Sequence, residues 1–278
     1  MQNFKIVTDS SSDIHSFPDV AYSCAPLKII TDNREYTDNK ELDVAQMISD
    51  LANYKGRSST SCPNTNDWLN TFGNSKNIFC ITISAELSGS YNSAVMAKEI
   101  YEEQHPNRKV FVINSRSTGG EMRLIVQKLS ELISQNLEFD DICSQITEYT
   151  EHTGLVFMLQ SMKNLANNGR VSHLVAKAAG LLGIRVLGCA SDIGTLQMLD
   201  KFRGEEKSLH GILSHLKELG FSGGKVEISH CQNPDFAEKV KDAIQKGFKT
   251  AKTNITACGG LCSFYAEKGG IIIGFEKI

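Results

Sequence analysis

The sequence predicts a two-domain α/β protein: an N-terminal α/β/α domain built on a parallel sheet, then an α+β domain with a mixed or antiparallel sheet. Its 278 residues exceed the roughly 100–200 residues of a typical single domain. In the first half, short apolar runs alternate with helical patterns, which is typical of a parallel sheet with crossover helices. In the second half, strand-like runs follow one another with few helices between them, which favours a mixed sheet.

In the first half, three apolar runs have the length and composition of buried strands: 4–7, 78–83 and 110–113. Apolar residues recur at helical spacing in four segments: 41–54, a short stretch through Trp68 and Phe72, 91–104, and 120–135. Residues 21–30 are predicted as a further extended stretch, and the serine- and threonine-rich residues 58–65 as a loop.

In the second half, six segments are predicted as strands: 155–159, 184–187, 195–202, 226–230, 255–257 and 270–275. Two amphipathic helices are predicted at 207–219 and 235–246. The change of pattern places the domain boundary near Thr153 and Gly154, within about ten residues, so the predicted domains are 1–153 and 154–278.

Clusters of small hydroxyl and amide residues follow the three first-half strands, at 8–13, 84–92 and 114–120. Beyond the carboxyl ends of parallel strands, helix N-termini present unpaired N–H groups, so such clusters predict an anion-binding pocket. The first cluster is equally well explained as an N-cap with turn residues. The second favours binding, because Ser88 precedes Gly89, where a missing Cβ lets backbone amides approach a ligand.

Composition and charge exclude several classes of protein. The net charge of −3 argues against nucleic-acid binding, and no apolar run reaches the roughly 20 residues of a membrane span, so we expect no stable membrane insertion. The N-terminus lacks a signal-peptide pattern, so a cytoplasmic location is expected. We expect most of the eight cysteines to be reduced core residues, and no metal to bind, since Cys258 and Cys262 alone do not supply four zinc ligands.

The motifs for catalysis and cofactor binding are missing from the sequence. There is no phosphate loop or dinucleotide fingerprint, so no cofactor is expected. Ser88 lies in Leu-Ser-Gly-Ser rather than in a nucleophile elbow, and none of the seven histidines lies in a hydroxyl cluster. Because triads assemble by folding, a serine-dependent esterase or thioesterase stays open as one alternative. A binding module for a small phosphorylated metabolite is the other, since helix N-termini also suit phosphate.

One charged residue follows a predicted helix end. Asn168 and Gly169 form a C-cap pattern, and Arg170 comes directly after it. A guanidinium there is suited to bidentate binding of a carboxylate or phosphate.

Together, five motifs in this order resemble the DegV family: Thr8-Asp9-Ser10-Ser11-Ser12-Asp13, Thr60-Ser61-x-Pro63, Ile83-Ser84-x-x-Leu87-Ser88-Gly89-Ser90-Tyr91, Asn168-Gly169-Arg170-Val171-Ser172 and Gly183-Ile184-Arg185. Members of this family are bacterial fatty-acid-binding proteins that carry the substrate of fatty acid kinase. The resemblance covers nearly the whole chain.

The resemblance implies a buried acyl chain whose carboxylate is held at the domain junction. By position, Thr60 and Ser88 donate hydroxyl hydrogen bonds to the carboxylate. Ser61 and the Gly89 amide lie nearby, and Arg170 matches the arginine of the family's Gly-Gly-Arg-Ile-Ser motif. No residue of this chain is then catalytic, because a separate ATP-dependent fatty acid kinase transfers the phosphoryl group.

Three positions bear on the partner and the ligand. Arg203 matches a basic position associated with the phosphorylated headgroup and the kinase. Tyr265 stands where the family pattern His-x-Gly-x-Gly has its histidine, so a phenol replaces an imidazole in the carboxylate network. Asn114 replaces the usual aspartate of the third cluster, and Val186 replaces a common proline. We therefore predict a non-catalytic protein that binds a long-chain fatty acid.

Overall fold

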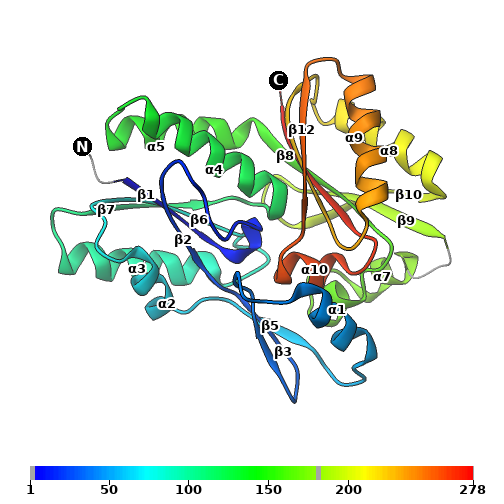
Figure 1. Ribbon diagram of the computed structural model, residues 1–278, viewed down its shortest axis with the longest axis horizontal. Coiled ribbons are helices and arrows are strands. Elements are labelled where there is room, and N and C mark those ends of the chain that lie inside the picture. Colours follow the sequence, from blue (N-terminus) through cyan, green and yellow to red (C-terminus); the bar gives the residue numbers. More distant parts are fainter. Residues whose placement is uncertain (1–3, 180–182, 278) are drawn as a thin grey trace.

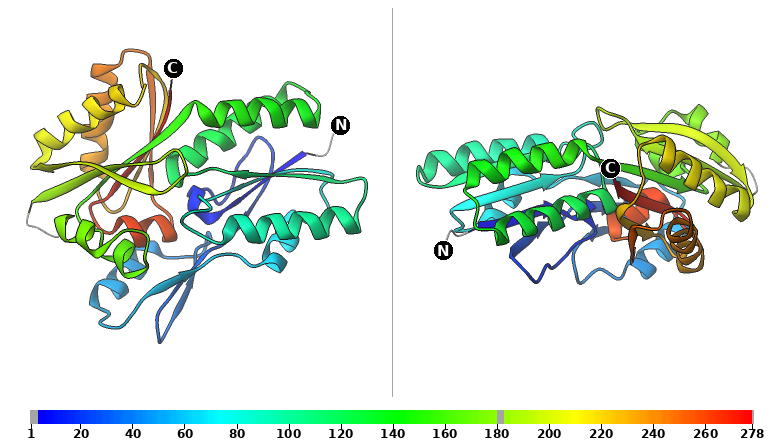
Figure 2. Two further views of the ribbon diagram at one scale, coloured as in Figure 1. Left: turned by 180° about the vertical axis from the view of Figure 1, so that it is seen from behind. Right: turned by 90° about the horizontal axis from the view of Figure 1, so that it is seen from above.

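The computed structural model describes residues 4–179 and 183–277 and contains three sheets (Figure 1). A four-stranded sheet has the order β2-β1-β6-β7, a six-stranded sheet the order β10-β9-β8-β13-β11-β12, and a three-stranded sheet the order β4-β3-β5. The two larger sheets lie side by side when the molecule is seen from above (Figure 2, right). The predicted α/β architecture with a parallel and a mixed sheet is confirmed.

The four-stranded sheet is parallel throughout. Its strands are β1 (Phe4–Asp9), β2 (Ala21–Ala25), β6 (Asn77–Thr82) and β7 (Lys109–Asn114). Helices α2 (Thr65–Phe72) and α3 (Ser90–Gln104) cover one face, and α4 (Gly119–Ser134) and α5 (Phe139–Glu151) cover the other (Figure 1). Because both faces are covered, β6 is apolar along its length, with Ile78, Phe79, Cys80 and Ile81 all fully buried.

The six-stranded sheet is mixed, because β11 and β12 are parallel and the other pairs are antiparallel. Its strands are β8 (Thr153–Leu159), β9 (Ile184–Ala190), β10 (Leu196–Arg203), β11 (Gly224–His230), β12 (Ala251–Ala257) and β13 (Ile271–Glu276). Helices α8 (Glu205–Glu218) and α9 (Pro234–Gly247) pack on one face, where Ile212, Phe236 and Val240 meet Val226 and Ile228.

Two predictions about the first half are wrong. The stretch 21–30 is not one strand: β2 pairs with β1, whereas β3 (Lys28–Ile30) pairs with β4 (Glu35–Thr37) and with β5 (Ser59–Ser61). Pro26 lies between the two strands, and a proline has no N–H with which to continue a ladder. Residues 58–65 are not all loop, since Thr60 lies in strand β5 and pairs with Ile29 of β3.

Four further helices surround the junction of the sheets: α1 (Val44–Asn53), α6 (Lys163–Asn167), α7 (His173–Ala179) and α10 (Gly260–Ala266). The sequence pattern predicts the first of these and, through the C-cap at Asn168 and Gly169, the end of α6; it does not predict α7 or α10. Residues 10–12 form a single 3-10 turn after β1.

Helix α4 joins the two larger sheets. Its N-terminus packs so closely on β11 and β13 that a Cβ at Gly120 would lie 2.4 Å from the carbonyl oxygen of Glu227. A Cβ at Gly274 would lie 2.1 Å from the backbone nitrogen of Glu121. Glycine is needed on both surfaces because any side chain would separate them. The boundary between residues 153 and 154 stays a prediction, since a helix of the first half packs on the second sheet.

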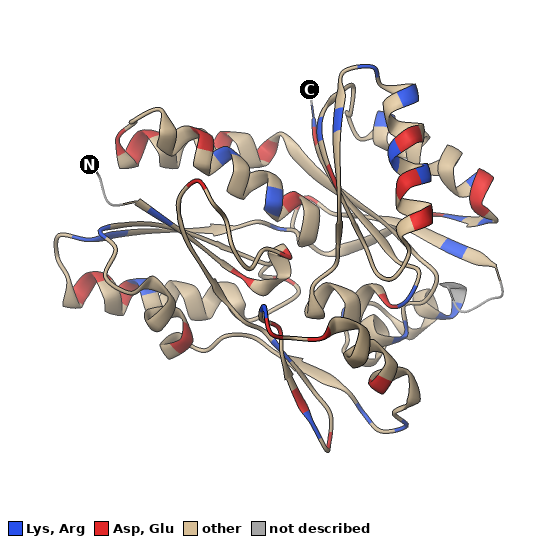
Figure 3. Ribbon diagram, in the orientation of Figure 1, with Lys and Arg blue, Asp and Glu red and all other residues tan. Residues whose placement is uncertain are grey.

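Two surface properties bear on partners. Within residues 4–179 and 183–277, none of the helices combines the length and apolarity needed to cross a bilayer. Along α9, acidic and basic residues are interspersed rather than gathered by sign (Figure 3).

Candidate functional site

A cavity of about 680 Å³, including its mouth, lies where the three sheets meet. The segments that line it come from β5, β8, β10, β13, α6, α10 and the loops before β3 and after β6 and β7. The lining residues are Leu27, Thr60, Ile83, Leu87, Ser88, Thr118, Leu155, Phe157, Leu159, Leu165, Arg170, Leu196, Leu261, Cys262, Tyr265, Ala266 and Ile272.

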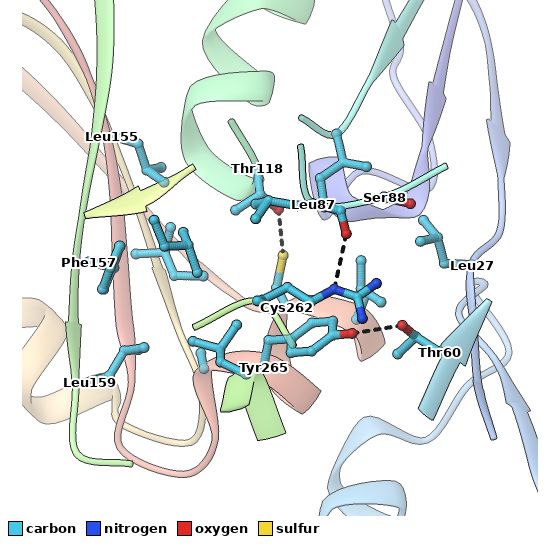
Figure 4. A pocket seen from close by; sticks show the side chains of 17 residues that line it. Leu27, Thr60, Leu87, Ser88, Thr118, Leu155, Phe157, Leu159, Cys262 and Tyr265 are labelled. Carbon is cyan, nitrogen blue, oxygen red and sulfur yellow. Dashed lines mark hydrogen bonds between the residues drawn. The ribbon is translucent and has the colours of Figure 1, made fainter. Parts of the chain in front are cut away.

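The cavity has an apolar end and a polar end (Figure 4). The apolar end is formed by alternate residues of β8, Leu155, Phe157 and Leu159, which project from the same face of the strand. The polar end is defined by the side chains of Thr60, Ser88, Arg170 and Tyr265, which the sequence predicts to bind the ligand. A ligand that fits both ends therefore has a long apolar part and a small polar tip.

Thr60 lies on strand β5 and Tyr265 on helix α10, and their side chains contact each other. The Thr60 Oγ1 and the Tyr265 hydroxyl are 2.7 Å apart, and either atom can donate the hydrogen bond. Burial raises the pKa of Tyr265, while the hydrogen bond from Thr60 and the charge of Arg170 lower it. The net direction is upward, so the phenol stays neutral and keeps a proton that it can donate to an anion.

Arg170 brings a positive charge to the polar end. Its Nε donates to the carbonyl oxygen of Leu87 at 3.1 Å, and its Nη1 donates to the carbonyl oxygen of Asn168 at 2.5 Å. The guanidinium lies 5.7 Å from the centre of the Tyr265 ring. Because a guanidinium has five N–H donors, these two bonds orient it and leave donors for a ligand.

Ser88 lies in the loop between β6 and α3. Its Oγ accepts a hydrogen bond from the Ser90 amide at 3.3 Å, and it lines the cavity. Ser61 and Gly89 lie next to lining residues in the chain but are not themselves in the wall. A Cβ at Gly89 would lie 3.3 Å from the Sγ of Cys62, which is tight contact. A role of Ser61 and Gly89 in binding stays a prediction.

Two polar lining residues, Thr118 and Cys262, were not predicted from the sequence to bind a ligand. Thr118 precedes α4, and its Oγ1 donates to the Ser11 carbonyl oxygen at 3.2 Å and lies 3.5 Å from the Sγ of Cys262. Burial raises the pKa of Cys262 well above its usual value, so its thiol is neutral. Thr118 belongs to the third hydroxyl-rich cluster, residues 114–120, and this cluster is the sequence feature from which its place in the cavity wall could have been predicted.

The first hydroxyl-rich segment, residues 8–13, does not line the cavity. Thr8 Oγ1 lies 2.9 Å from Ser12 Oγ, and both residues are fully buried. The Asp9 carboxylate accepts from the Ile83 amide at 2.9 Å, from Ser90 Oγ at 2.6 Å, and from both the amide and the hydroxyl of Ser11. The turn interpretation of this segment fits these contacts, because the side-chain oxygens of Thr8, Asp9 and Ser12 are bonded within the protein.

Arg203 lies at the end of β10, exposed and outside the cavity wall. Its strand is paired with β9, where Arg203 is opposite Ile184. A role of Arg203 toward a partner or a phosphate stays a prediction.

The lining residues bear on whether Ser88 has a general base beside it. Among the 17 of them, all within the described part of the chain, there is no histidine, aspartate or glutamate that would act as a base. Nor do the described residues contain a group of three or more His, Cys, Asp or Glu side chains placed to hold a metal.

Comparison with known proteins identifies the family. The family model described as "Uncharacterised protein, DegV family" matches residues 3–277. The chain belongs to the DegV family. A DegV domain-containing protein of Streptococcus pneumoniae is 40% identical to it over 277 residues, which are 98% of this chain and 99% of the relative. The resemblance found from the motifs is thereby confirmed.

Solved structures of DegV proteins are similar over the whole chain. A DegV family protein from Eubacterium eligens, loaded with heptadecanoic acid, is 43% identical with a TM-score of 0.97, covering 99% of this chain and 100% of that one. The Streptococcus pneumoniae Fatty Acid Kinase (Fak) B3 protein, loaded with linoleic acid, is 39% identical with a TM-score of 0.97 and the same coverage.

Proposed function

We propose that this protein is a non-catalytic binder of a long-chain fatty acid, with the carboxylate at the polar end of the cavity and the acyl chain in its apolar part. The observation that carries the proposal is the division of one cavity into a wall of aliphatic and aromatic side chains and a small group of hydroxyls beside one guanidinium. The acids bound by the two similar DegV proteins have this division too.

The energetics fit a lipid ligand. Burying each methylene contributes about 0.8 kcal/mol, so a chain of about sixteen carbons gains on the order of 10 kcal/mol before the costs of association. A carboxylate only accepts hydrogen bonds and is costly to bury without donors. Thr60, Ser88, Tyr265 and Arg170 together offer the donors that a carboxylate requires.

The partner we propose is a separate ATP-dependent fatty acid kinase, as the name of the Fak B3 relative suggests. In that case the acid is presented to the kinase, and this chain contributes binding rather than phosphoryl transfer. We place the encounter in the cytoplasm, where ATP is present and where the eight free cysteines stay reduced. Arg203, exposed at the end of β10, is our candidate contact for the kinase or the phosphorylated headgroup.

Native mass spectrometry of the purified protein, followed by denaturation and solvent extraction, tests the binding proposal. We expect about one long-chain acid per chain, or stoichiometric uptake when acid is added to lipid-stripped protein. A protein that carries no acid and takes none up contradicts the proposal. Thermal shifts with sugar phosphates, run in parallel, separate a lipid carrier from a module for a phosphorylated metabolite, because only a ligand of the native state raises the melting temperature.

A further inference from the structure

The polar end of the cavity is assembled from separate parts of the chain. Thr60 is on β5, Arg170 follows α6, and Tyr265 is on α10. Thr60 and Tyr265 are 205 residues apart in sequence, yet their hydroxyls are in contact. Hydrogen bonds to a carboxylate weaken quickly when donor and acceptor move from their preferred distance and angle. Something must therefore hold these three segments in register.

Asn164, in α6, holds the segment that carries Tyr265. Its side-chain Nδ2 donates to the carbonyl oxygen of Phe264 at 2.8 Å, and its backbone N–H donates to Oε1 of Glu267 at 3.0 Å. These two contacts are on either side of Tyr265 in the chain. Because the C-terminal end of α10 is tied to α6 at both points, the direction of the Tyr265 ring follows from the position of α6.

Asn168, which ends α6, connects the other two segments. Its Nδ2 has two hydrogens and donates both, to the carbonyl oxygen of Ser58 at 3.3 Å and to that of Asn164 at 2.9 Å. Ser58 directly precedes β5, the strand of Thr60. The backbone carbonyl of Asn168 accepts from Nη1 of Arg170 at 2.5 Å. One residue thus contacts the strand of Thr60, the helix of Asn164 and the guanidinium.

We infer that Asn164 and Asn168 are positioning residues: they set the spacing of Thr60, Arg170 and Tyr265 and so make the polar end selective for a carboxylate over a neutral headgroup. Neither side chain lines the cavity, so both act through other residues. The amide of each faces carbonyl oxygens, which only accept hydrogen bonds and so require a donor such as the side-chain NH₂. A supporting layer of this kind keeps binding groups in their productive geometry. The inference rests on the proposed function.

The test compares two ligands with the same tail on lipid-stripped protein, hexadecanoic acid and hexadecan-1-ol, titrated calorimetrically from cyclodextrin complexes. Asn168→Ala removes the donors to Ser58 and Asn164 but keeps the carbonyl that orients Arg170. Asn164→Ala removes the donor to Phe264. Asn167→Ala, at an exposed position on the same helix, is the matched control.

We expect each of the two variants to raise the Kd for the acid about five- to ten-fold, the equivalent of one lost hydrogen bond, and to change the Kd for the alcohol much less. The control Asn167→Ala should leave the ratio of the Kd for the acid to the Kd for the alcohol unchanged. A general loosening of the fold would weaken both ligands equally, so an unchanged ratio in Asn164→Ala and Asn168→Ala overturns the inference.

The outcome also separates this inference from the proposed function. Wild-type protein that fails to bind the acid contradicts the proposed function itself. Wild-type protein that binds the acid, with variants that keep the wild-type ratio, contradicts only the positioning role. If Asn164→Ala does not fold, Asn168→Ala alone decides, because its side chain is half-buried and lies at the helix end.

Discussion

The segment 8–13 and the polar end of the cavity contain the same kinds of side chain but use them differently. In segment 8–13 the Asp9 carboxylate and the hydroxyls near it are bonded to one another and to amides of the protein. At the polar end, Ser88 and the Thr60–Tyr265 pair border a cavity, and Arg170 has donors to spare. A hydroxyl-rich composition therefore indicates a polar network. Hydrogen-bonding groups that border a cavity and still have donors available indicate a binding site.

The largest effect is expected on stability, from Asp9→Ala. The substitution leaves the Ile83 amide, the Ser90 hydroxyl and the donors of Ser11 without their acceptor in the interior. We expect a loss of at least about 3 kcal/mol of unfolding free energy, measured by urea denaturation. The exposed Asp19→Ala is the control and should change stability little. A loss under about 1 kcal/mol in Asp9→Ala would contradict a structural role for this segment.

The next effect is expected on binding, from the double substitution Thr60→Ala and Ser88→Ala. It removes two hydroxyls of the polar end, so we expect the Kd for a long-chain acid to rise about thirty-fold, as for two hydrogen bonds. The melting temperature of the ligand-free protein should change little, because both residues are only half-buried. Unchanged affinity in a folded double variant would show that the carboxylate lies elsewhere.

A smaller effect concerns the pH dependence of stability. Burial and, to a smaller extent, the nearby charge of Asp38 raise the pKa of Asp13 from 3.8 to about 7, although the Gly259 amide opposes the shift. Between these two pKa values the folded state binds the proton that the unfolded state has lost. Stability therefore falls as pH rises through this range.

The Asp13→Asn variant isolates this contribution. Asparagine keeps an acceptor for the Gly259 amide, and it tolerates the positive φ of 56° at this position. Urea denaturation at pH about 5 and about 8 should show a smaller decrease in stability in the variant than in the wild type. An equal decrease in both proteins would mean that Asp13 ionises normally in the folded state.

The smallest effect, on the affinity for the acid, is expected from Tyr265→Phe. It keeps the ring that lies near Arg170 and removes only the hydroxyl bonded to Thr60. We expect acid binding to weaken about three- to five-fold in calorimetric titration, less than in the double variant. A loss as large as that of the double variant would instead make the phenol the principal donor to the carboxylate.

Much of the fold was predictable because it depends on local patterns. The apolar run of β6 and the helical spacing in α4 and α9 are visible in the sequence. Strand β5 was missed because Ser59, Thr60 and Ser61 carry no apolar alternation, and its pairing with β3 comes from tertiary structure.

Helix α10 was not predicted because it is short and because the residue that caps its N-terminus is distant in the sequence. The Gly260 and Leu261 amides donate to the carboxylate of Asp38, and Gly260 and Asp38 are 222 residues apart in the chain. In the candidate site, the motif resemblance selected Thr60, Ser88, Arg170 and Tyr265, which the fold brings together. The apolar walls could not be selected, because a cavity wall such as Leu155 uses the same residue types as the core.

A crystal structure of the protein with a bound long-chain acid tests the central claim most directly. We expect the carboxylate within hydrogen-bond distance of Thr60 Oγ1 and Ser88 Oγ, with the acyl chain running toward Leu155 and Phe157. An acid bound in the reverse direction, with its carboxylate among the β8 side chains, or bound outside this cavity, would contradict it.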